Sequence, residues 1–421
     1  MKELRARAML SLDGPAEAAL IVGARDKERV RGLTHGYYKY PARFSPLFAR
    51  AAIETLTRPG DLVIDNHVGG GTTLVEAMAA GRDGIGIDIS TLAQFVATTK
   101  TTVYNEAELD RLGAWASRIA NAIDARKHSI HFADYATLGY YKHLDHPSRW
   151  RIRKAIEQGL GSAIRMGDDR LEQFGRCAVL RTAQWALDGR KKLPTLGEFR
   201  SFLKGTTVEM LEGARSLRAT VQACGRDPTI EILNRSAAGI EDDARLRGRR
   251  APKLVLTSPP YPGVHVLYHR WQVDGRKEAS APFWIAGKLD GSGSSYYTMG
   301  DRKFPDLRTY FDNIRATMSS IAALADAETV IVQMVAFSEA SWQLPRYLET
   351  MEEAGLMELF LPSIQHEHDG RLWRTVPGRR WYSQQRGATP GSNEVVLIHQ
   401  KAVPYLMQPH RPPRTAARSR P

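Results

Sequence analysis

The segment Ser258-Pro259-Pro260-Tyr261 directly follows the apolar run 254–257, which reads as a short strand. Proline fixes φ and has no N–H, so this loop is stiff and its carbonyls lack obvious local partners. The exocyclic amino nitrogen of a nucleobase is a poor nucleophile, because its lone pair is delocalised into the ring. If the Ser258 hydroxyl and a proline carbonyl accept hydrogen bonds from this amino group, they favour a pyramidal nitrogen. Tyr261 would stack on the base. A purely structural proline turn is the alternative.

A second loop, residues 68–73, carries three consecutive glycines between a predicted strand at 62–64 and a predicted helix from about Thr72 to Ala80. Such a loop lets a ligand approach the backbone and presents free N–H groups at a helix start. A P-loop needs Lys after its last glycine, and the dinucleotide fingerprint needs a third glycine where Leu74 stands. The loop therefore favours S-adenosyl-L-methionine over a nucleotide phosphate.

Asp88 ends the next predicted strand, seventeen residues after Gly71. A carboxylate at this position can accept hydrogen bonds from both hydroxyls of a ribose. The alternative is that the glycines only close a strand-to-helix corner and that Asp88 caps the helix beginning near Thr91.

The elements around these loops predict an α/β fold with a doubly wound, mostly parallel sheet. The strand 62–64, the helix 72–80 and the strand 84–88 form a βαβ unit, and such short apolar strands are typical of a sheet buried on both faces. Further strands are predicted at 230–233, 254–257, 329–335 and 394–399. Ligands of such sheets bind at the carboxyl edge, where both loops would lie.

A large helical insertion is predicted between roughly residues 105 and 225, where no strand series occurs. Residues 141–192 contain 12 Lys plus Arg and 6 Asp plus Glu, which fits either a solvated face or a phosphate-facing one. The expected divisions are an N-terminal extension (1–30), a cofactor-binding half (31–104), the insertion as candidate target-recognition region (105–225), a target-amino half (226–401) and a basic disordered tail (402–421).

Composition sets the broad class. The chain has 421 residues with 43% hydrophobic and 25% charged residues, which is ordinary for a globular protein. Its formal net charge of +13 makes a polyanionic partner plausible. Two cysteines and the lack of a signal peptide or membrane span lead us to expect a soluble, cytoplasmic protein without membrane association.

Three motifs together carry a family resemblance. Residues 257–261 and 65–77 resemble the target-amino pocket and the S-adenosylmethionine loop of the amino-group DNA methyltransferases of restriction-modification systems. Residues 35–46 resemble the N-terminal cofactor motif of that family, which packs against the methionine portion. One departure is Asp65-Asn66-His67, where the family usually has Asp-Pro-Phe before the glycines.

The resemblance implies a Rossmann-like methyltransferase fold and transfer of a methyl group from S-adenosyl-L-methionine to a base rotated out of double-stranded DNA. A cognate restriction endonuclease is an implied candidate partner. The implied cofactor-binding residues are Tyr40, Phe44, Asp65, Gly69, Gly71, Thr72 and Asp88, and the implied residues of the target pocket are Ser258, Pro259, Pro260 and Tyr261.

Ser258 at the first pocket position resembles the N4-cytosine enzymes more than the N6-adenine ones, so N4 of cytosine is the preferred target. Two alternatives stay open. An RNA or tRNA amino-methyltransferase would use the same pocket chemistry. The second alternative is a catalytically silent nucleic-acid-binding protein of this fold. The polar His67 in the glycine motif is the feature that favours it.

Other residues bear on substrate and chemistry. Methylation of a ring carbon needs a cysteine nucleophile, usually after a proline, whereas Cys177 and Cys224 follow Arg and Ala. The segment 365–386 interleaves basic and aromatic residues, which suits either nucleic-acid contact or packing on the sheet. No metal is predicted, because His265 and His269 lack a complement of further ligands.

Overall fold

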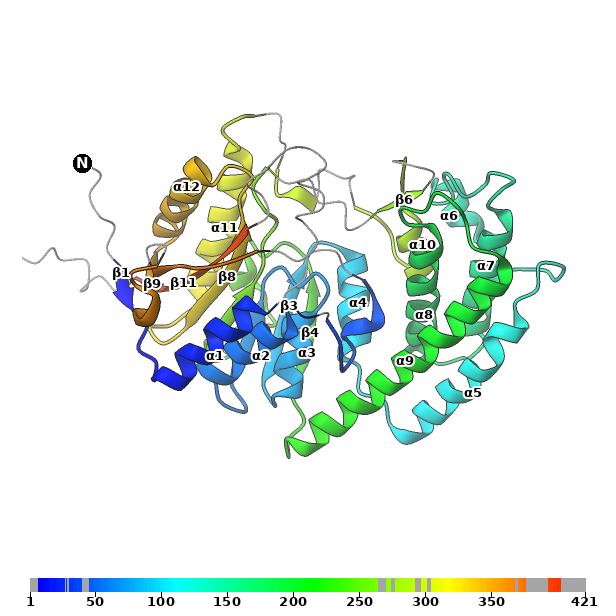
Figure 1. The fold of residues 1–421 in the computed structure, drawn as a ribbon, viewed down its shortest axis with the longest axis horizontal. Helices are drawn as coiled ribbons and strands as arrows, with labels where there is room; N and C mark the ends of the chain where they lie inside the picture. Colours follow the sequence, from blue (N-terminus) through cyan, green and yellow to red (C-terminus); the bar gives the residue numbers. More distant parts are fainter. Residues whose placement is uncertain are drawn as a thin grey trace, which may run out of the picture.

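The computed structural model describes residues 7–26, 28, 30–39, 45–263, 270–273, 277–291, 297–300, 304–367, 370–375 and 393–402. These ranges form a mixed sheet with flanking helices and, beside it, a bundle of further helices (Figure 1). Within them, no helix combines the length and the apolar character needed to cross a bilayer.

The main sheet has nine strands within the described ranges, in the order β1-β9-β11-β8-β5-β2-β3-β4, with β10 beside β11. Adjacent strands run parallel except at β11, which is antiparallel to β8, β9 and β10. The strands are β1 (Arg7–Met9), β2 (Leu62–Asp65), β3 (Asp83–Asp88), β4 (Ile230–Asn234), β5 (Leu254–Thr257), β8 (Val330–Ala336), β9 (Leu356–Phe360), β10 (Leu372–Thr375) and β11 (Asn393–Lys401).

Helices cover both faces of this sheet (Figure 1). Successive residues of a central strand point alternately to the two faces, which is why the strands are apolar throughout. In β5, Leu254 and Leu256 join the core under α1 and α2, whereas Val255 joins the core under α11 and α12. The predicted α/β, doubly wound, mostly parallel fold is thus confirmed. The flanking helices are α1 (Gly14–Arg25), α2 (Pro46–Leu56), α3 (Thr72–Ala79), α4 (Thr91–Thr101), α11 (Arg308–Leu324) and α12 (Ala340–Glu353).

The helices between β3 and β4 form a bundle with its own apolar core, to the right in Figure 1. Capping boxes at Asn105 and Thr195 fix the starts of its helices α5 and α9. The small sheet β6–β7 and helix α10, from later in the chain, complete this core. The elements are α5 (Glu106–Ala122), α6 (Ala133–Thr137), α7 (Trp150–Ile164), α8 (Asp169–Leu187), α9 (Leu196–Ala223), α10 (Ala281–Ala286), β6 (Trp271–Val273) and β7 (Lys277–Ala279).

The two ends of the chain relate differently to the fold. The predicted N-terminal extension supplies an edge strand, since β1 pairs in parallel with β9. It also supplies α1, which begins where Asp13 accepts a hydrogen bond from the Ala16 N–H at 2.8 Å. The predicted basic tail lies outside the described residues beyond Ala402.

The strand order reverses at β2. The chain proceeds from β2 to β3 and β4 on one side and returns to β5 and β8 on the other. Since β2 pairs in parallel with both β3 and β5, their carboxyl ends meet at one edge. Such a reversal leaves a crevice between the neighbouring loops, and ligands of open α/β sheets bind there.

Gly86 of β3 is required for packing beneath the glycine loop. A Cβ at this position would stand 2.6 Å from Leu74 Cδ1 and 2.9 Å from Val68 Cγ2. We expect Gly86→Ala to lower the free energy of unfolding by about 1–3 kcal/mol, because the added methyl overfills this core.

A matched control is Gly113→Ala in α5, where a Cβ meets no atom within 4 Å. This change should stabilise the protein by about 0.5–1 kcal/mol, because alanine favours a helix interior over glycine. Urea denaturation of both variants tests the pair. An unchanged midpoint for Gly86→Ala would contradict the packing described.

Candidate functional site

The glycine loop and the Ser-Pro-Pro-Tyr loop meet at the carboxyl ends of β2 and β5. Across this junction the hydroxyl of Thr257 donates a hydrogen bond to Asp65 Oδ1 at 2.9 Å. The hydroxyl of Thr73, in the first turn of α3, donates to the carbonyl of Leu256 at 3.2 Å. Both threonines are fully buried. The two predicted loops are therefore fixed side by side.

The glycine loop adopts backbone angles that favour glycine. Gly69 and Gly71 have φ of 44° and 75°, in the left-handed region. A Cβ on Gly71 would also lie 3.0 Å from the Cα of Ala97 in α4, so the turn fits closely against that helix. Thr72 follows as the first residue of α3.

A buried lysine supports the loop from below. The ammonium of Lys100, in α4, donates to the carbonyl of Gly70 at 2.6 Å. Its side chain is fully buried, and a cation in such a place is stabilised only by close acceptors. Sequence analysis did not identify Lys100, because a lone lysine in a helix is ordinarily a surface residue.

Asp88 lies beside the glycine loop as predicted. One carboxylate oxygen accepts from the Gly69 N–H at 2.9 Å and the other from the Ser90 N–H at 2.8 Å. Each carboxylate oxygen has a further lone pair, so Asp88 retains acceptor capacity. Burial raises the pKa of Asp88 to about 6, while the two backbone hydrogen bonds oppose that rise.

Asp65 shares this electrostatic environment. Burial raises its pKa to about 6, and the charge of Asp88 adds to the rise. Hydrogen bonds from Thr73, His67 and Thr257 act in the opposite direction. Two carboxylates thus lie at the ends of adjacent strands, and the pKa of each is raised to about 6.

His67 occupies the position at which the family usually has phenylalanine. Burial lowers its pKa to about 3, so the ring is neutral near pH 7. Its Nδ1 lies 3.3 Å from the hydroxyl of Thr257, whose proton is directed to Asp65. The neutral ring therefore donates from Nδ1 and joins the contacts between the two loops.

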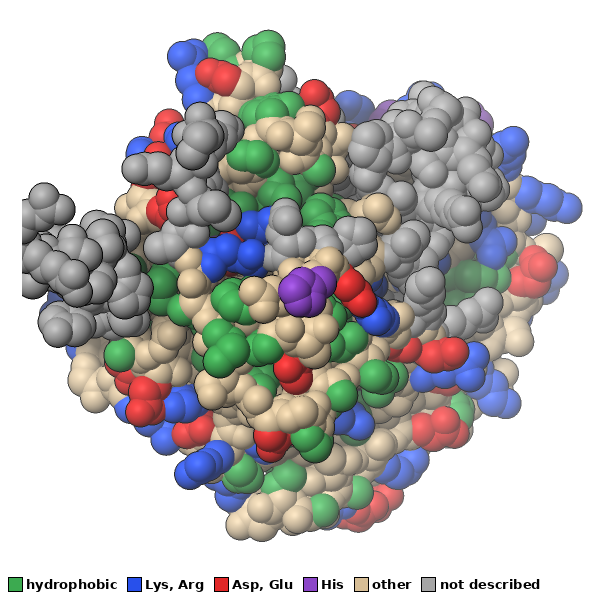
Figure 2. Space-filling view, turned by 60° about the vertical axis from the view of Figure 1, so that its left-hand side comes forward, with side chains coloured by type: hydrophobic (Ala, Val, Ile, Leu, Met, Phe, Trp, Pro, Cys, Tyr) green, Lys and Arg blue, Asp and Glu red, His purple; other side chains and the backbone are tan. Residues whose placement is uncertain are grey.

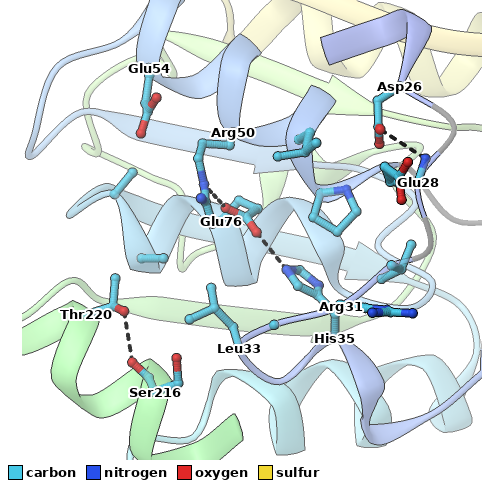
Figure 3. A pocket seen from close by; sticks show the side chains of 16 residues that line it. Asp26, Glu28, Arg31, Leu33, His35, Arg50, Glu54, Glu76, Ser216 and Thr220 are labelled. Atoms are coloured by element: carbon cyan, nitrogen blue, oxygen red, sulfur yellow. Dashed lines mark hydrogen bonds and ion pairs between the residues drawn. The ribbon is translucent and has the colours of Figure 1, made fainter.

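The N-terminal motif contacts the glycine helix through the buried Glu76. His35 Nε2 lies 2.7 Å from one oxygen of Glu76 in α3, and Arg50 of α2 donates to the other at 2.8 Å. Figure 3 shows His35 and Arg50 pointing toward Glu76 from two sides, beside a cavity of about 560 Å³ lined also by Ser216 and Thr220 of α9. Neither Asp65 nor Asp88 lines this cavity. Tyr40 and Phe44, the predicted cofactor residues of this motif, lie outside the described residues.

The Ser-Pro-Pro-Tyr loop is anchored on both sides. The Ser258 hydroxyl donates to the carbonyl of Met334 in β8 at 3.0 Å, and the Tyr310 hydroxyl donates to the carbonyl of Pro260 at 2.8 Å. Among the described residues, no donor contacts the carbonyl of Pro259. Two acceptors therefore remain here, namely the lone pairs of Ser258 and the carbonyl of Pro259.

Tyr261 makes a contact that sequence analysis did not predict. Its hydroxyl donates to Glu394 Oε1 at 2.6 Å, and Glu394 Oε2 pairs with Arg374 at 3.2 Å. The Tyr261 side chain is 5% exposed, so its ring is less accessible than expected. Glu394 and Arg374 face each other in adjacent strands, a cross-strand pairing that no local motif reveals.

Three further sequence features lie wholly or partly outside the described residues. His265 and His269 are among them, as is most of the basic and aromatic segment 365–386. Within that segment, Arg371 pairs with Glu358 at 2.6 Å and Arg374 with Glu394, both inside the fold. The described residues contain no group of three or more metal-ligating side chains.

Comparisons with known proteins match part of the chain to a methyltransferase family. Residues 21–97, which include the glycine loop and Asp88, match the family model described as DNA methylase. The type II methyltransferase M.MjaII of Methanocaldococcus jannaschii is 34% identical over 87 residues, 21% of this chain and 16% of that protein. M.MvaI of Kocuria varians is 37% identical over 82 residues, 19% of this chain and 18% of that protein. The alignments thus span less than a fifth of either relative.

Solved structures resemble the chain only distantly. The rRNA methyltransferase aviRa from Streptomyces viridochromogenes has a TM-score of 0.33 at 11% identity, covering 86% of this chain and 89% of that one. TrmN from Thermus thermophilus has a TM-score of 0.32 at 10% identity, covering 87% and 52%. Neither score bears on function. The family model and the two type II relatives confirm the resemblance to the amino-group DNA methyltransferases of restriction-modification systems that the three motifs predicted.

Proposed function

We propose that this protein transfers a methyl group from S-adenosyl-L-methionine to the exocyclic amino group of a base rotated out of duplex DNA. The observation that carries the proposal is the junction of β2 and β5, where Thr257 donates to Asp65 and joins the two loops. A cofactor loop and an amino-binding loop have to adjoin for a methyl group to pass between them. The match of residues 21–97 to the family model supports the assignment of the glycine loop.

The residues at this edge fit S-adenosyl-L-methionine. The glycine turn permits close approach of a ligand, and Asp88 retains acceptor capacity for two ribose hydroxyls. Asp65 offers a carboxylate toward the cationic methionine end. Thr72, at the start of α3, completes the loop. When bound, the cofactor supplies a methyl group on a positively charged sulfur, which is the electrophile.

Ser258 and Pro259 are assigned to the amino group of the target base. Because the Ser258 proton is directed to the Met334 carbonyl, its oxygen acts as an acceptor. The Pro259 carbonyl is the second acceptor, and the proline ring keeps it in place. Two acceptors on the N–H groups favour a pyramidal nitrogen with a localised lone pair, and they hold it in line with the incoming methyl group.

Tyr261 is assigned to stacking on the base, with Glu394 as its positioning residue. The 2.6 Å hydrogen bond to Glu394 fixes the ring at the end of the rigid loop. Since the ring is 5% exposed, stacking requires neighbouring groups to move aside when the base enters. Removing a base from the duplex costs roughly a few kcal/mol, and stacking of the base on Tyr261 offsets part of this cost.

The preferred target is N4 of cytosine, with N6 of adenine as the alternative, because Ser rather than Asp opens the loop. A restriction endonuclease is the proposed functional partner. Expression in a host without DNA methylation, followed by sequencing that maps modified bases, tests target atom and sequence context together. Labelled methyl transfer by the purified protein to duplex DNA, compared with total RNA, tests the substrate. Transfer to RNA alone would refute the proposal.

Replacing Tyr261 separates base stacking from cofactor binding. We expect Tyr261→Ala to lower kcat/KM for DNA by about tenfold to a hundredfold, because stacking on an aromatic ring is worth about 1–3 kcal/mol per base. Binding of S-adenosyl-L-methionine, measured by calorimetry, should stay within about twofold of wild type. Equal losses of both would contradict the assigned role.

Tyr261→Phe is the matched control, since it keeps the ring and removes only the hydroxyl that Glu394 accepts. It should retain more activity than Tyr261→Ala. If the two variants were equally impaired, the hydroxyl contact rather than the ring would be the functional element.

Cofactor affinity should fall as the pH drops through about 6. Asp65 and Asp88 both have their pKa raised to about 6, and only their ionised forms attract a cation or accept two hydroxyls fully. Between pH 7 and pH 5 the ionised fraction of each falls about tenfold, so the affinity should fall by at least that factor. Calorimetric titration across this range measures the effect.

The control is Asp88→Asn, which removes one of the two titrating groups. This variant should bind more weakly at pH 7 and lose affinity less steeply toward pH 5. A pH profile as steep as that of wild type would exclude Asp88 from the cofactor site.

A further inference from the structure

An exposed cationic surface lies on the helical bundle, away from the two loops of the proposed active site. It consists of a turn after α5 and the first residues of α7. We call it the Trp150 surface, and its residues are Arg126, Lys127, Trp150, Arg151 and Lys154. Arg126, Lys127, Trp150 and Arg151 are all exposed.

The turn is held on α7 by hydrogen bonds to its backbone. Gln158 of α7 donates to the carbonyls of Asp124 and Lys127 at 2.8 and 3.1 Å. Lys154 donates to the carbonyl of Ala125 at 2.8 Å. The Asp124 N–H donates in return to Gln158 at 2.9 Å. The surface is therefore preformed, which reduces the ordering cost of binding.

The cations of this surface lack acidic partners. Among the described residues, no carboxylate pairs with Arg126, Lys127 or Arg151. The nearby acids are otherwise engaged, since Asp145 and Glu157 both pair with Arg153, and Asp124 accepts the backbone N–H of Arg126 at 2.9 Å. The face in Figure 2 differs, because there Lys and Arg are interspersed with Asp and Glu over the described surface.

Trp150 lies beside two of these cations. Its side chain is 38% exposed, with the Arg151 guanidinium 5.5 Å and the Lys154 ammonium 6.0 Å from its ring centroid. A large apolar ring between cations suits a ligand that presents negative charge and flat or sugar surfaces together. The backbone of a nucleic acid has this chemistry.

The bundle places this surface at a distance from the active site. Arg200, near the start of α9, donates to the carbonyl of Ile123, whereas the Tyr37 hydroxyl of the cofactor-side segment donates to the carbonyl of Met210. Ten residues of helix separate these contacts, about 15 Å at 1.5 Å per residue.

We propose that the Trp150 surface binds the phosphate backbone of the duplex DNA that flanks the flipped base. The inference rests on the proposed function and adds to it the region that holds the flanking DNA. Such contacts carry no sequence information, but they fix the register of the duplex and offset the cost of base rotation. Other contacts would then recognise the base sequence of the DNA.

The test replaces the three unpaired cations in Arg126→Ala/Lys127→Ala/Arg151→Ala. We expect duplex DNA binding to weaken at least tenfold at 150 mM salt. The slope of log K against log salt should become shallower by about 2.7, because each lost phosphate contact removes about 0.9. Fluorescence anisotropy over a range of salt concentrations measures both, and cofactor binding by calorimetry reports an intact fold.

The matched control is Lys204→Ala/Arg215→Ala/Arg247→Ala, which removes the same charge from three exposed positions elsewhere. Its salt slope should equal that of wild type. If both triple variants had the same slope of log K against log salt, the proposal that the Trp150 surface binds DNA would be wrong. The proposed function would still stand if the wild-type protein methylates DNA. Absence of methyl transfer by wild type would instead overturn the function. A triple variant impaired with total RNA but not with duplex DNA would overturn the choice of DNA.

Discussion

The hydrogen bond from Thr257 to Asp65 is the contact on which the candidate site depends. It joins residues 192 positions apart, at the ends of two strands that pair in parallel. Both groups are buried, so neither finds a replacement partner in water, and breaking the bond would remove one of the few donors that stabilise a buried carboxylate. The register of β2 against β5 therefore sets how far the glycine loop lies from the Ser-Pro-Pro-Tyr loop. Given this register, stiff loops are sufficient to keep that distance.

The same burial accounts for the departure at His67. A charged histidine beside a cationic cofactor would repel it, which is why a polar residue in a phenylalanine position is unexpected. In this environment desolvation lowers the pKa of His67 to about 3, so the ring is a neutral, flat and largely apolar group. Its remaining polarity is directed to Thr257. The substitution thus keeps the shape of an aromatic residue and adds a link between the two loops.

The sequence predicted the central strands well because each is a short apolar run buried on both faces, as in Leu254–Thr257. It did not predict β9, in which the polar Glu358 interrupts the pattern. Glu358 is buried only because Arg7 and Arg371 pair with it from distant segments. Glu394 was missed for the same reason, since its partner Tyr261 lies 133 residues away. Buried charged residues are stabilised by partners that are distant in the sequence, and a local sequence pattern does not reveal such partners.

The helical bundle is attached to both halves of the site rather than appended to one. Trp271, which follows the Ser-Pro-Pro-Tyr loop in the chain, is buried in the bundle core and donates to the hydroxyl of Tyr38 at 3.0 Å. Arg176 of α8 donates to the carbonyl of Ile285 in α10 at 3.1 Å. Excising residues 105–225 would therefore expose apolar surface from segments on either side of the crevice. A force applied to the bundle by bound DNA would reach the cofactor side and the target side together.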